Sequence, residues 1–196
     1  MEHVELDREF PLLEFDQVYP IKFQEISKIH WTPVEVIKLA VEWLIQKDET
    51  KILDIGSGVG KFCIVGALIS KAKFTGIEKR EYLFEEALKV KNKIGVNNVE
   101  FINDNITNFD FKNYNSFYYY NPFCEQIATT DLIDNSISYS ENKFELYQEY
   151  VSEQFKKAAI GTKIVTYCSD SYVIPSGYAL SNLNYNGLLQ LWIKEY

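Results

Sequence analysis

A glycine-rich turn constrains the fold of this chain more than any other feature. The turn, DIGSGVG over residues 54–60, follows an apolar strand predicted over residues 51–55. It directly precedes an apolar helix predicted over residues 62–70, of the kind that packs against a sheet. Glycines let the chain turn sharply and let a ligand lie against bare backbone. The helix N-terminus adds free N–H groups and a positive dipole end, which suit a carboxylate or a phosphate.

Predicted strands and helices alternate along most of the chain. Helices are predicted between most of the strands, and a further one begins at Thr32-Pro33-Val34-Glu35, with Thr32 as its N-cap. The last two strands meet at Asn186-Gly187, a pair typical of a hairpin turn. The pattern predicts an α/β fold, a three-layer sandwich with helices on both faces of a seven-stranded, mostly parallel sheet whose last strand is antiparallel. The strands after the first are expected over residues 74–78, 99–103, 116–120, 163–168, 178–183 and 188–194.

The chain is expected to hold one domain preceded by an arm. Its 196 residues suffice for one sizeable core, and no linker rich in Pro, Gly or Ser divides them. Residues 1–30 are irregular and acidic, and they are predicted to form an N-terminal arm laid over a domain of residues 31–196. The apolar residues expected to anchor the arm are Leu12, Leu13, Phe15, Val18 and Ile21.

Composition restricts the compartment and the cofactor class. The chain is 46% hydrophobic, yet no apolar run approaches the ~20 residues of a membrane span. Its acidic start is the reverse of a signal-peptide n-region, so a soluble, cytoplasmic protein without a membrane partner is expected. The three cysteines lie far apart without metal-ligand spacing, and there are only two histidines. No metal site is predicted.

Three interpretations of the glycine turn compete. A nucleotide-triphosphate loop has four residues before its Gly-Lys pair and then Ser or Thr, whereas here three residues separate Gly56 from Gly60 and Phe62 follows Lys61. That interpretation fails. A dinucleotide loop needs a third glycine where Lys61 stands, which leaves a nicotinamide-dependent oxidoreductase as a weak alternative. A merely structural turn leaves the neighbouring acidic residues unexplained.

The turn resembles the first motif of class I S-adenosylmethionine-dependent methyltransferases, Asp-x-Gly-x-Gly-x-Gly after the first strand. The resemblance extends from about His30 to the C-terminus and is strongest to uncharacterised bacterial methyltransferase-domain proteins. It implies S-adenosylmethionine as cofactor and S-adenosylhomocysteine as product. It further implies that Gly60 allows close packing of helix and strand, and that the methionine end of the cofactor is lined by Asp54, Gly56, Ser57 and Gly58.

The resemblance assigns the rest of the cofactor to the next two strand ends. Glu78 ends the second strand, where the family holds the ribose hydroxyls, and a carboxylate can accept from two hydroxyls at once. After the third strand the chain reads Asp104-Asn105-Ile106, where the family usually has Gly-Asp and an apolar residue. Either Asp104 or Asn105 is expected to accept from the adenine amino group, with the backbone of Ile106 at the ring edge.

The fourth strand ends in Asn121-Pro122-Phe123, which resembles the Asn-Pro-Pro-Tyr/Phe motif of methyltransferases that act on planar nitrogen, with one proline missing. The resemblance implies that Asn121 orients the acceptor and that Phe123 stacks on it. The alternative is a turn with Phe123 packed inward. Glu125 and His30 are candidate general bases. A substrate lid is expected over residues 125–140, with Tyr139 and the 171–177 loop at the same mouth.

The predicted function is methyl transfer to an unidentified acceptor. A net charge of −8 opposes the phosphate backbone and disfavours nucleic acid, so a nitrogen or oxygen of a small molecule or a protein is favoured. A non-catalytic S-adenosylmethionine-binding module is the second interpretation. The sequence indicates no oligomeric state.

Overall fold

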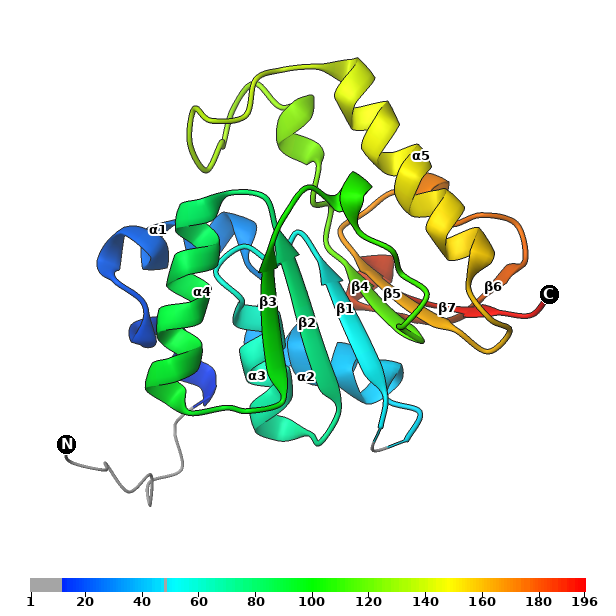
Figure 1. The fold of residues 1–196 in the computed structure, drawn as a ribbon, viewed down its shortest axis with the longest axis horizontal. Helices are drawn as coiled ribbons and strands as arrows, with labels where there is room; N and C mark the ends of the chain where they lie inside the picture. The colour runs from blue at the N-terminus through cyan, green and yellow to red at the C-terminus, as the bar shows by residue number, and fades with distance from the viewer. Residues whose placement is uncertain (1–11, 48) are drawn as a thin grey trace.

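The computed structural model describes residues 12–47 and 49–196, which form a sheet of seven strands covered by helices on both faces (Figure 1). The strand order is β3-β2-β1-β4-β5-β7-β6. Neighbours among β1 to β5 pair in parallel, and β7 is antiparallel to both β5 and β6, which confirms the predicted fold class. The strands are β1 (Lys51–Ile55), β2 (Lys73–Glu78), β3 (Val99–Asn103), β4 (Ser116–Tyr119), β5 (Lys163–Tyr167), β6 (Tyr178–Asn184) and β7 (Leu189–Lys194).

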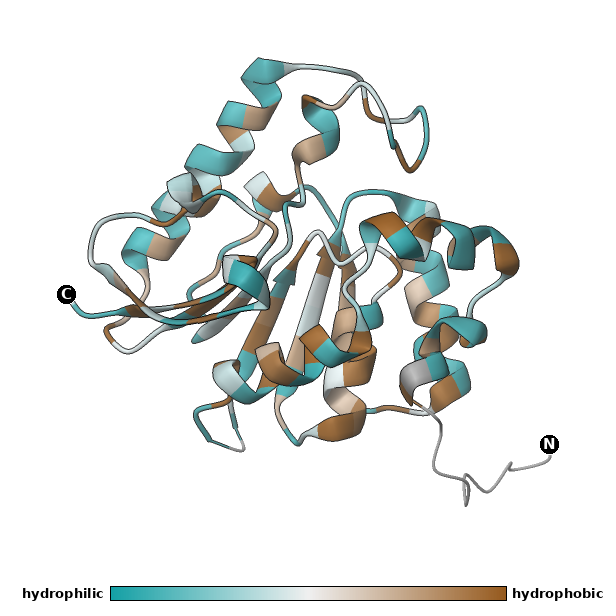
Figure 2. Cartoon of the chain, turned by 180° about the vertical axis from the view of Figure 1, so that it is seen from behind, coloured by the Kyte–Doolittle hydropathy of each residue, from teal (hydrophilic) through white to brown (hydrophobic). Residues whose placement is uncertain are grey.

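One face of the sheet carries most of the helices. Buried side chains of these helices form one apolar cluster with Ile52, Phe74 and Tyr118 of the strands. Figure 2 shows the hydrophobic residues concentrated in the strands and in the helices that lie in front of them in that view. The helices on this face are α1 (Ile21–His30), α2 (Val34–Leu44), α3 (Lys61–Ile69) and α4 (Glu81–Ile94), preceded by the 3-10 segment η1 (Leu12–Val18).

The opposite face is covered by one long helix, α5 (Glu141–Lys157), and by three short 3-10 turns. The Ser140 side chain caps α5 by accepting from the Lys143 N–H, and the buried face of the helix packs over β1, β4 and β5. The turns are η2 (Ile106–Asn108), η3 (Cys124–Gln126) and η4 (Ser171–Val173), while η5 (Tyr185–Gly187) joins β6 to β7 as the expected hairpin. No helix among the described residues is long and apolar enough to cross a membrane.

The start of α2 differs from the sequence prediction. Pro33 occupies the N-cap, and Thr32 does not cap the helix. The Thr32 hydroxyl instead shares a hydrogen bond of 2.7 Å with the hydroxyl of Tyr118, inside the core. A buried Tyr hydroxyl needs a partner, and this need outweighed the local capping preference.

The described part of the predicted arm lies directly against the glycine turn. Phe15 and Val18 are buried as expected. Ile21 is 73% exposed, so its prediction as an apolar anchor of the arm is wrong. The Tyr19 hydroxyl donates to the Val59 carbonyl at 3.1 Å, and Lys61 pairs with Asp16 at 2.6 Å. Residues 1–11 of the arm and the side chain of Leu13 lie outside the described residues.

Candidate functional site

A cavity of about 490 Å³ opens at the carboxyl ends of the parallel strands. Its walls come from the turn after β1, the ends of β2 and β4, the loop after β3 and the segment that follows η3. In parallel α/β sheets this edge is where ligands bind. Of the site residues predicted above, all but Gly60 line the cavity: Asp54, Gly56, Ser57, Gly58, Glu78, Asp104, Asn105, Ile106, Asn121, Pro122 and Phe123.

The glycine turn is tied to β2 and leaves open space above its middle. The N–H groups of Gly56 and Ser57 both donate to the Ile77 carbonyl at 3.0 Å. Gly58 has a φ of +54°, and a Cβ there would meet only the Trp31 indole nitrogen, at 3.9 Å. The Ser57 hydroxyl is buried without a hydrogen-bond partner among the described residues. The turn therefore presents bare backbone to the cavity, while the buried Ser57 hydroxyl lies against Gly76 of β2.

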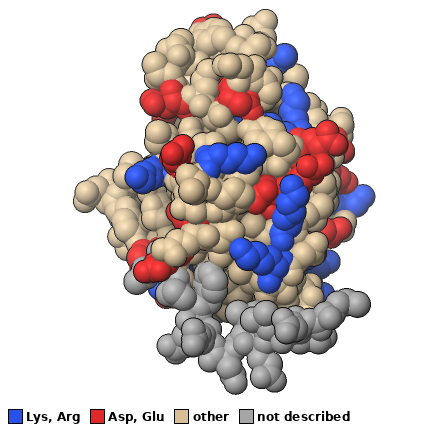
Figure 3. Space-filling view, turned by 90° about the vertical axis from the view of Figure 1, so that its left-hand side faces the viewer, with Lys and Arg blue, Asp and Glu red and all other residues tan. Residues whose placement is uncertain are grey.

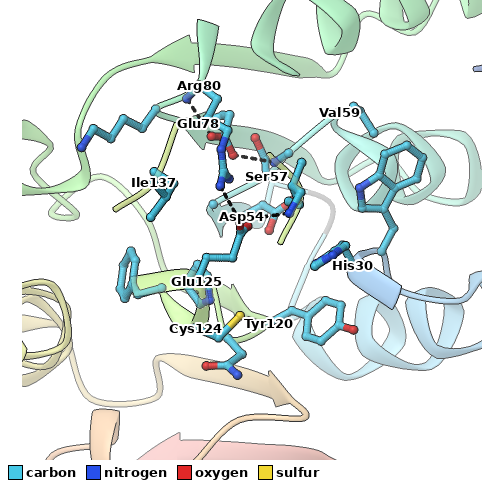
Figure 4. A pocket seen from close by; sticks show the side chains of 18 of the residues that line it. His30, Asp54, Ser57, Val59, Glu78, Arg80, Tyr120, Cys124, Glu125 and Ile137 are labelled. Carbon is cyan, nitrogen blue, oxygen red and sulfur yellow. Dashed lines mark hydrogen bonds and ion pairs between the residues drawn. The ribbon is translucent and has the colours of Figure 1, made fainter. Parts of the chain in front are cut away.

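Glu78 reaches from the end of β2 across to this turn (Figure 4). One carboxylate oxygen accepts from the Gly58 N–H at 2.9 Å, and the other accepts from the Arg80 N–H at 2.8 Å. Burial raises the pKa of Glu78, while these N–H donors and the charge of Arg80 lower it in part. The carboxylate thus lies at the mouth of the glycine turn.

Asp54 is a second buried carboxyl, at the floor of the same cavity. Burial raises its pKa to about 7, the thiol of Cys63 lowers the pKa by donating at 3.5 Å, and the charge of Glu78 raises it. A cationic group placed beside Asp54 would favour its charged form.

Gly60 lies behind the cavity, where α3 meets β3 and α4. A Cβ at this position would lie 2.3 Å from the Phe101 ring and 3.0 Å from the Ala87 side chain. Its φ of +78° is in the left-handed region that favours glycine. Gly60 therefore acts in close packing, and its contribution to the cavity is indirect.

The loop after β3 is held by its own side chains. Asp104 accepts from the Asn105 N–H at 2.6 Å and from the Asn108 amide at 2.8 Å. The Asn105 oxygen accepts from the Thr107 N–H at 3.3 Å, and its amide nitrogen donates to the Tyr147 hydroxyl at 3.4 Å. Asp104 and Asn105 each already accept a hydrogen bond within the loop. The geometry therefore does not indicate which of them would accept from an adenine amino group.

The end of β4 forms a sharp corner in the cavity wall. Asn121 has a φ of +37°, and its N–H donates to the Ser169 hydroxyl at 2.8 Å. Asn121 lines the cavity, and its side-chain amide has no hydrogen bond to any other described residue. Pro122 lies so close to the glycine turn that a Cβ on Gly56 would be 2.5 Å from it. Phe123 lines the cavity but is only 8% exposed, and its ring packs 5.1 Å from the ring of Tyr147.

The two candidate bases, Glu125 and His30, differ in whether an ion pair already engages the side chain. Glu125 forms an ion pair of 2.7 Å with Arg80, and both side chains are about nine-tenths buried, at 10% and 11% exposed. His30 lines the cavity, and its pKa is lowered by burial, against an opposing effect of Glu125. His30 is therefore neutral at pH 7 and has a nitrogen lone pair that can accept a proton.

Comparison with protein families decides the class. The family described as "Methyltransferase domain" matches residues 46–170, which include the glycine turn, Glu78 and the end of β4. The chain belongs to this methyltransferase family. None of the curated proteins compared matches it.

Solved structures place this methyltransferase domain in the same fold class. An RNA methyltransferase from Salinibacter ruber in complex with S-adenosyl-L-homocysteine is 22% identical, with a TM-score of 0.58 over 84% of this chain and 94% of that one. TrmN from Thermus thermophilus is 13% identical, with a TM-score of 0.64 over 88% and 52%. Magnesium protoporphyrin IX methyltransferase from Synechocystis PCC 6803 with bound SAM is 12% identical, with a TM-score of 0.58 over 92% and 89%. The predicted class I methyltransferase family and fold are confirmed.

The cavity residues of the methyltransferase domain that sequence reasoning missed include Lys79, Arg80 and Tyr147. Two of them directly follow Glu78 at a strand end, a position that places side chains at the ligand edge. Tyr147 belongs to the regular apolar face of α5 and carried no separate signal. Of the predicted lid, several residues between Glu125 and Ile137 line the cavity, whereas Tyr139 and the 171–177 loop do not.

Proposed function

We propose that this chain transfers the methyl group of S-adenosylmethionine to a nitrogen or oxygen of a small molecule or a protein, leaving S-adenosylhomocysteine. One observation carries the proposal. The Glu78 carboxylate lies 2.9 Å from the Gly58 N–H, so a group able to accept from two ribose hydroxyls borders a turn of bare backbone. Neither a nucleotide-triphosphate loop nor a merely structural turn requires that arrangement.

The residues of the cavity fit this cofactor. Gly58 leaves the space that a side chain would fill, and the Ser57 hydroxyl lacks a partner among the described residues. Asp54 supplies a buried carboxyl for an ammonium group, and Glu78 supplies one for the ribose. The methionine part would be held by Asp54, Gly56, Ser57 and Gly58, and the adenine by Asp104, Asn105 and Ile106.

The chain's own residues would contribute to catalysis mainly by positioning the acceptor. When bound, the cofactor supplies a methyl group that its sulfonium has already activated. Holding an acceptor close and aligned then accounts for most of the rate enhancement. The side-chain amide of Asn121, which has no partner among the described residues, can orient the acceptor, with Phe123 in the wall beside it. Neutral His30 can take up a proton where the nucleophile starts protonated.

The charge of the chain supports an acceptor other than nucleic acid. The net charge is −8, and acidic and basic side chains are interspersed on the face seen in Figure 3. A nucleic-acid-binding surface instead gathers Lys and Arg in a patch or stripe. A small molecule or a protein side chain is the acceptor class that we propose to test first.

Titration calorimetry tests the cofactor assignment. S-adenosylmethionine and S-adenosylhomocysteine are expected to bind saturably, and NAD is not. Gly58→Val should abolish that binding because a branched side chain would occupy the ligand's space, whereas Gly95→Val, at a helix end with nothing within 4 Å, should leave the affinity of the folded protein unchanged. Binding of NAD with none of the sulfur ligands would contradict the proposal.

Transfer of a labelled methyl group tests the activity itself. Label from S-adenosylmethionine is expected in a metabolite extract or a protein extract, and not in total RNA. Asn121→Ala should reduce the transfer and leave cofactor affinity within a few-fold. Tight cofactor binding without any labelled product would instead favour the non-catalytic module.

A further inference from the structure

Arg80 connects the two halves of the cavity. Its backbone N–H donates to Glu78 at 2.8 Å, on the side proposed to hold the ribose. Its guanidinium donates to Glu125 at 2.7 Å, on the acceptor side (Figure 4). No other described residue has hydrogen bonds to both carboxylates.

The same guanidinium holds the segment of residues 124–137, called the flap below. Arg80 Nε lies 3.5 Å from the Asp134 carboxylate and donates to the Ser136 hydroxyl at 3.3 Å. Glu125, held by Arg80, in turn accepts from the Ile133 N–H at 3.1 Å, which closes the flap on itself. Three polar side chains of the flap thus converge on one guanidinium.

The flap forms the cavity wall next to the end of β4. Its lining residues include Cys124, Gln126, Asp131 and Ile137, and it follows Asn121-Pro122-Phe123 directly. A planar guanidinium with five donors suits this task, because it can bind several oxygens in fixed directions. Arg80 thus links the flap to Glu78, and the Tyr82 hydroxyl, which donates to Asp134, is a second contact that holds the flap.

We propose that Arg80 is a positioning residue that couples occupancy of the Glu78 side of the cavity to closure of the flap over the acceptor side. The inference rests on the proposed function, since it takes a nucleoside thioether as the ligand that Glu78 holds. A ligand that fixes Glu78 also fixes the Arg80 backbone, and through its guanidinium the flap. By reciprocity, a closed flap raises the affinity for that ligand.

Hydrogen–deuterium exchange with S-adenosylhomocysteine as the probe tests the coupling. In the parent protein the ligand is expected to slow exchange both in the glycine turn and in the flap. In Arg80→Gln/Glu125→Gln it should still slow exchange in the turn but no longer in the flap. The double variant is chosen because removing one partner alone leaves a buried charge unpaired, which can prevent folding. Calorimetry on the same variant should show ~5- to 20-fold weaker binding, in the range typical of such couplings.

Lys38→Gln/Glu35→Gln is the matched control, because it removes an exposed ion pair of 3.1 Å on α2. It should leave affinity and flap exchange as in the parent. Flap protection that persists in the Arg80 variant, or that is missing from the parent while the turn is protected, overturns the inference. Failure of the parent to bind the probe at all would instead contradict the proposed function.

Discussion

At the scale of single residues, Asp54 makes stability depend on pH. Burial raises its pKa to about 7, and the neighbours that modify this pKa are Cys63 and Glu78. An aspartate in an unfolded chain titrates near pH ~3.9. Between about pH 4 and pH 7 the folded chain therefore binds more protons at this site than the unfolded chain does.

The stability supplied by protonated Asp54 is fully present below about pH 4 and is lost as the pH rises through about 7. The free energy of unfolding should fall by about 1.4 kcal/mol per pH unit in that window. Asp54→Asn removes this effect, so from pH 5 to pH 8 the variant should lose ~3 kcal/mol less stability than the parent. Urea unfolding at three pH values measures the difference. An identical pH profile of the two proteins would contradict the assignment, since Glu78 titrates in both.

The same substitution separates stability from binding. Asparagine keeps the shape of the side chain but lacks the charge proposed to receive the ligand's ammonium group. At pH 8 we therefore expect Asp54→Asn to be more stable than the parent and to bind S-adenosylhomocysteine more weakly. A buried acid that lowers stability at the pH of function is typical of a binding site.

At the scale of secondary structure, the junction of α3 with β3 and α4 is a tightly packed support behind the site. Gly60→Ala would place a Cβ 2.3 Å from the Phe101 ring, in addition to the strain of its left-handed φ. Gly95→Ala has a similar φ, +82°, but nothing within 4 Å, so it is the matched control. We expect a loss of about 1 kcal/mol for Gly95→Ala and of ~3 kcal/mol or more for Gly60→Ala, measured by urea unfolding. Equal losses would mean that close packing at Gly60 contributes nothing.

The elements themselves were largely predictable from the sequence, because their signals are local. Apolar periodicity, the glycine turn and Asn186-Gly187 each act within a few residues, and the sheet with its antiparallel strand followed from them. The exceptions depend on partners far along the chain. Thr32 bonds to Tyr118, 86 residues away, and Arg80 bonds to Glu125, 45 residues away. No local pattern encodes such pairs, so the sequence pointed to a segment that lines the cavity but not to the arginine that binds it.

At the scale of the whole molecule, the cavity and a pair of stabilising lysine contacts lie at opposite ends of the parallel strands. Lys163 begins β5 and donates to the carbonyls of Trp43 and Ile45 at 2.7 and 3.3 Å, at the C-terminal end of α2. Lys194 ends the neighbouring β7 and donates to the carbonyls of Phe155 and Lys156, at the end of α5. The two lysines thus attach one helix of each face to the same corner of the sheet, away from the cavity.

This separation predicts that stability can change without a change in binding. Lys194→Met removes a buried ammonium from the last carbonyls of α5, and charged hydrogen bonds of this kind contribute about 1.5–3 kcal/mol. The free energy of unfolding should fall by that amount, while the S-adenosylhomocysteine affinity of the folded protein stays within two-fold of the parent, about 0.4 kcal/mol. Lys156→Met is the control on the same helix, since its side chain is 60% exposed and its pairing with Glu153 should contribute almost nothing. A matching loss of affinity in Lys194→Met would show that α5 transmits changes from this corner to the cavity, through Tyr147, and that the two ends are not independent.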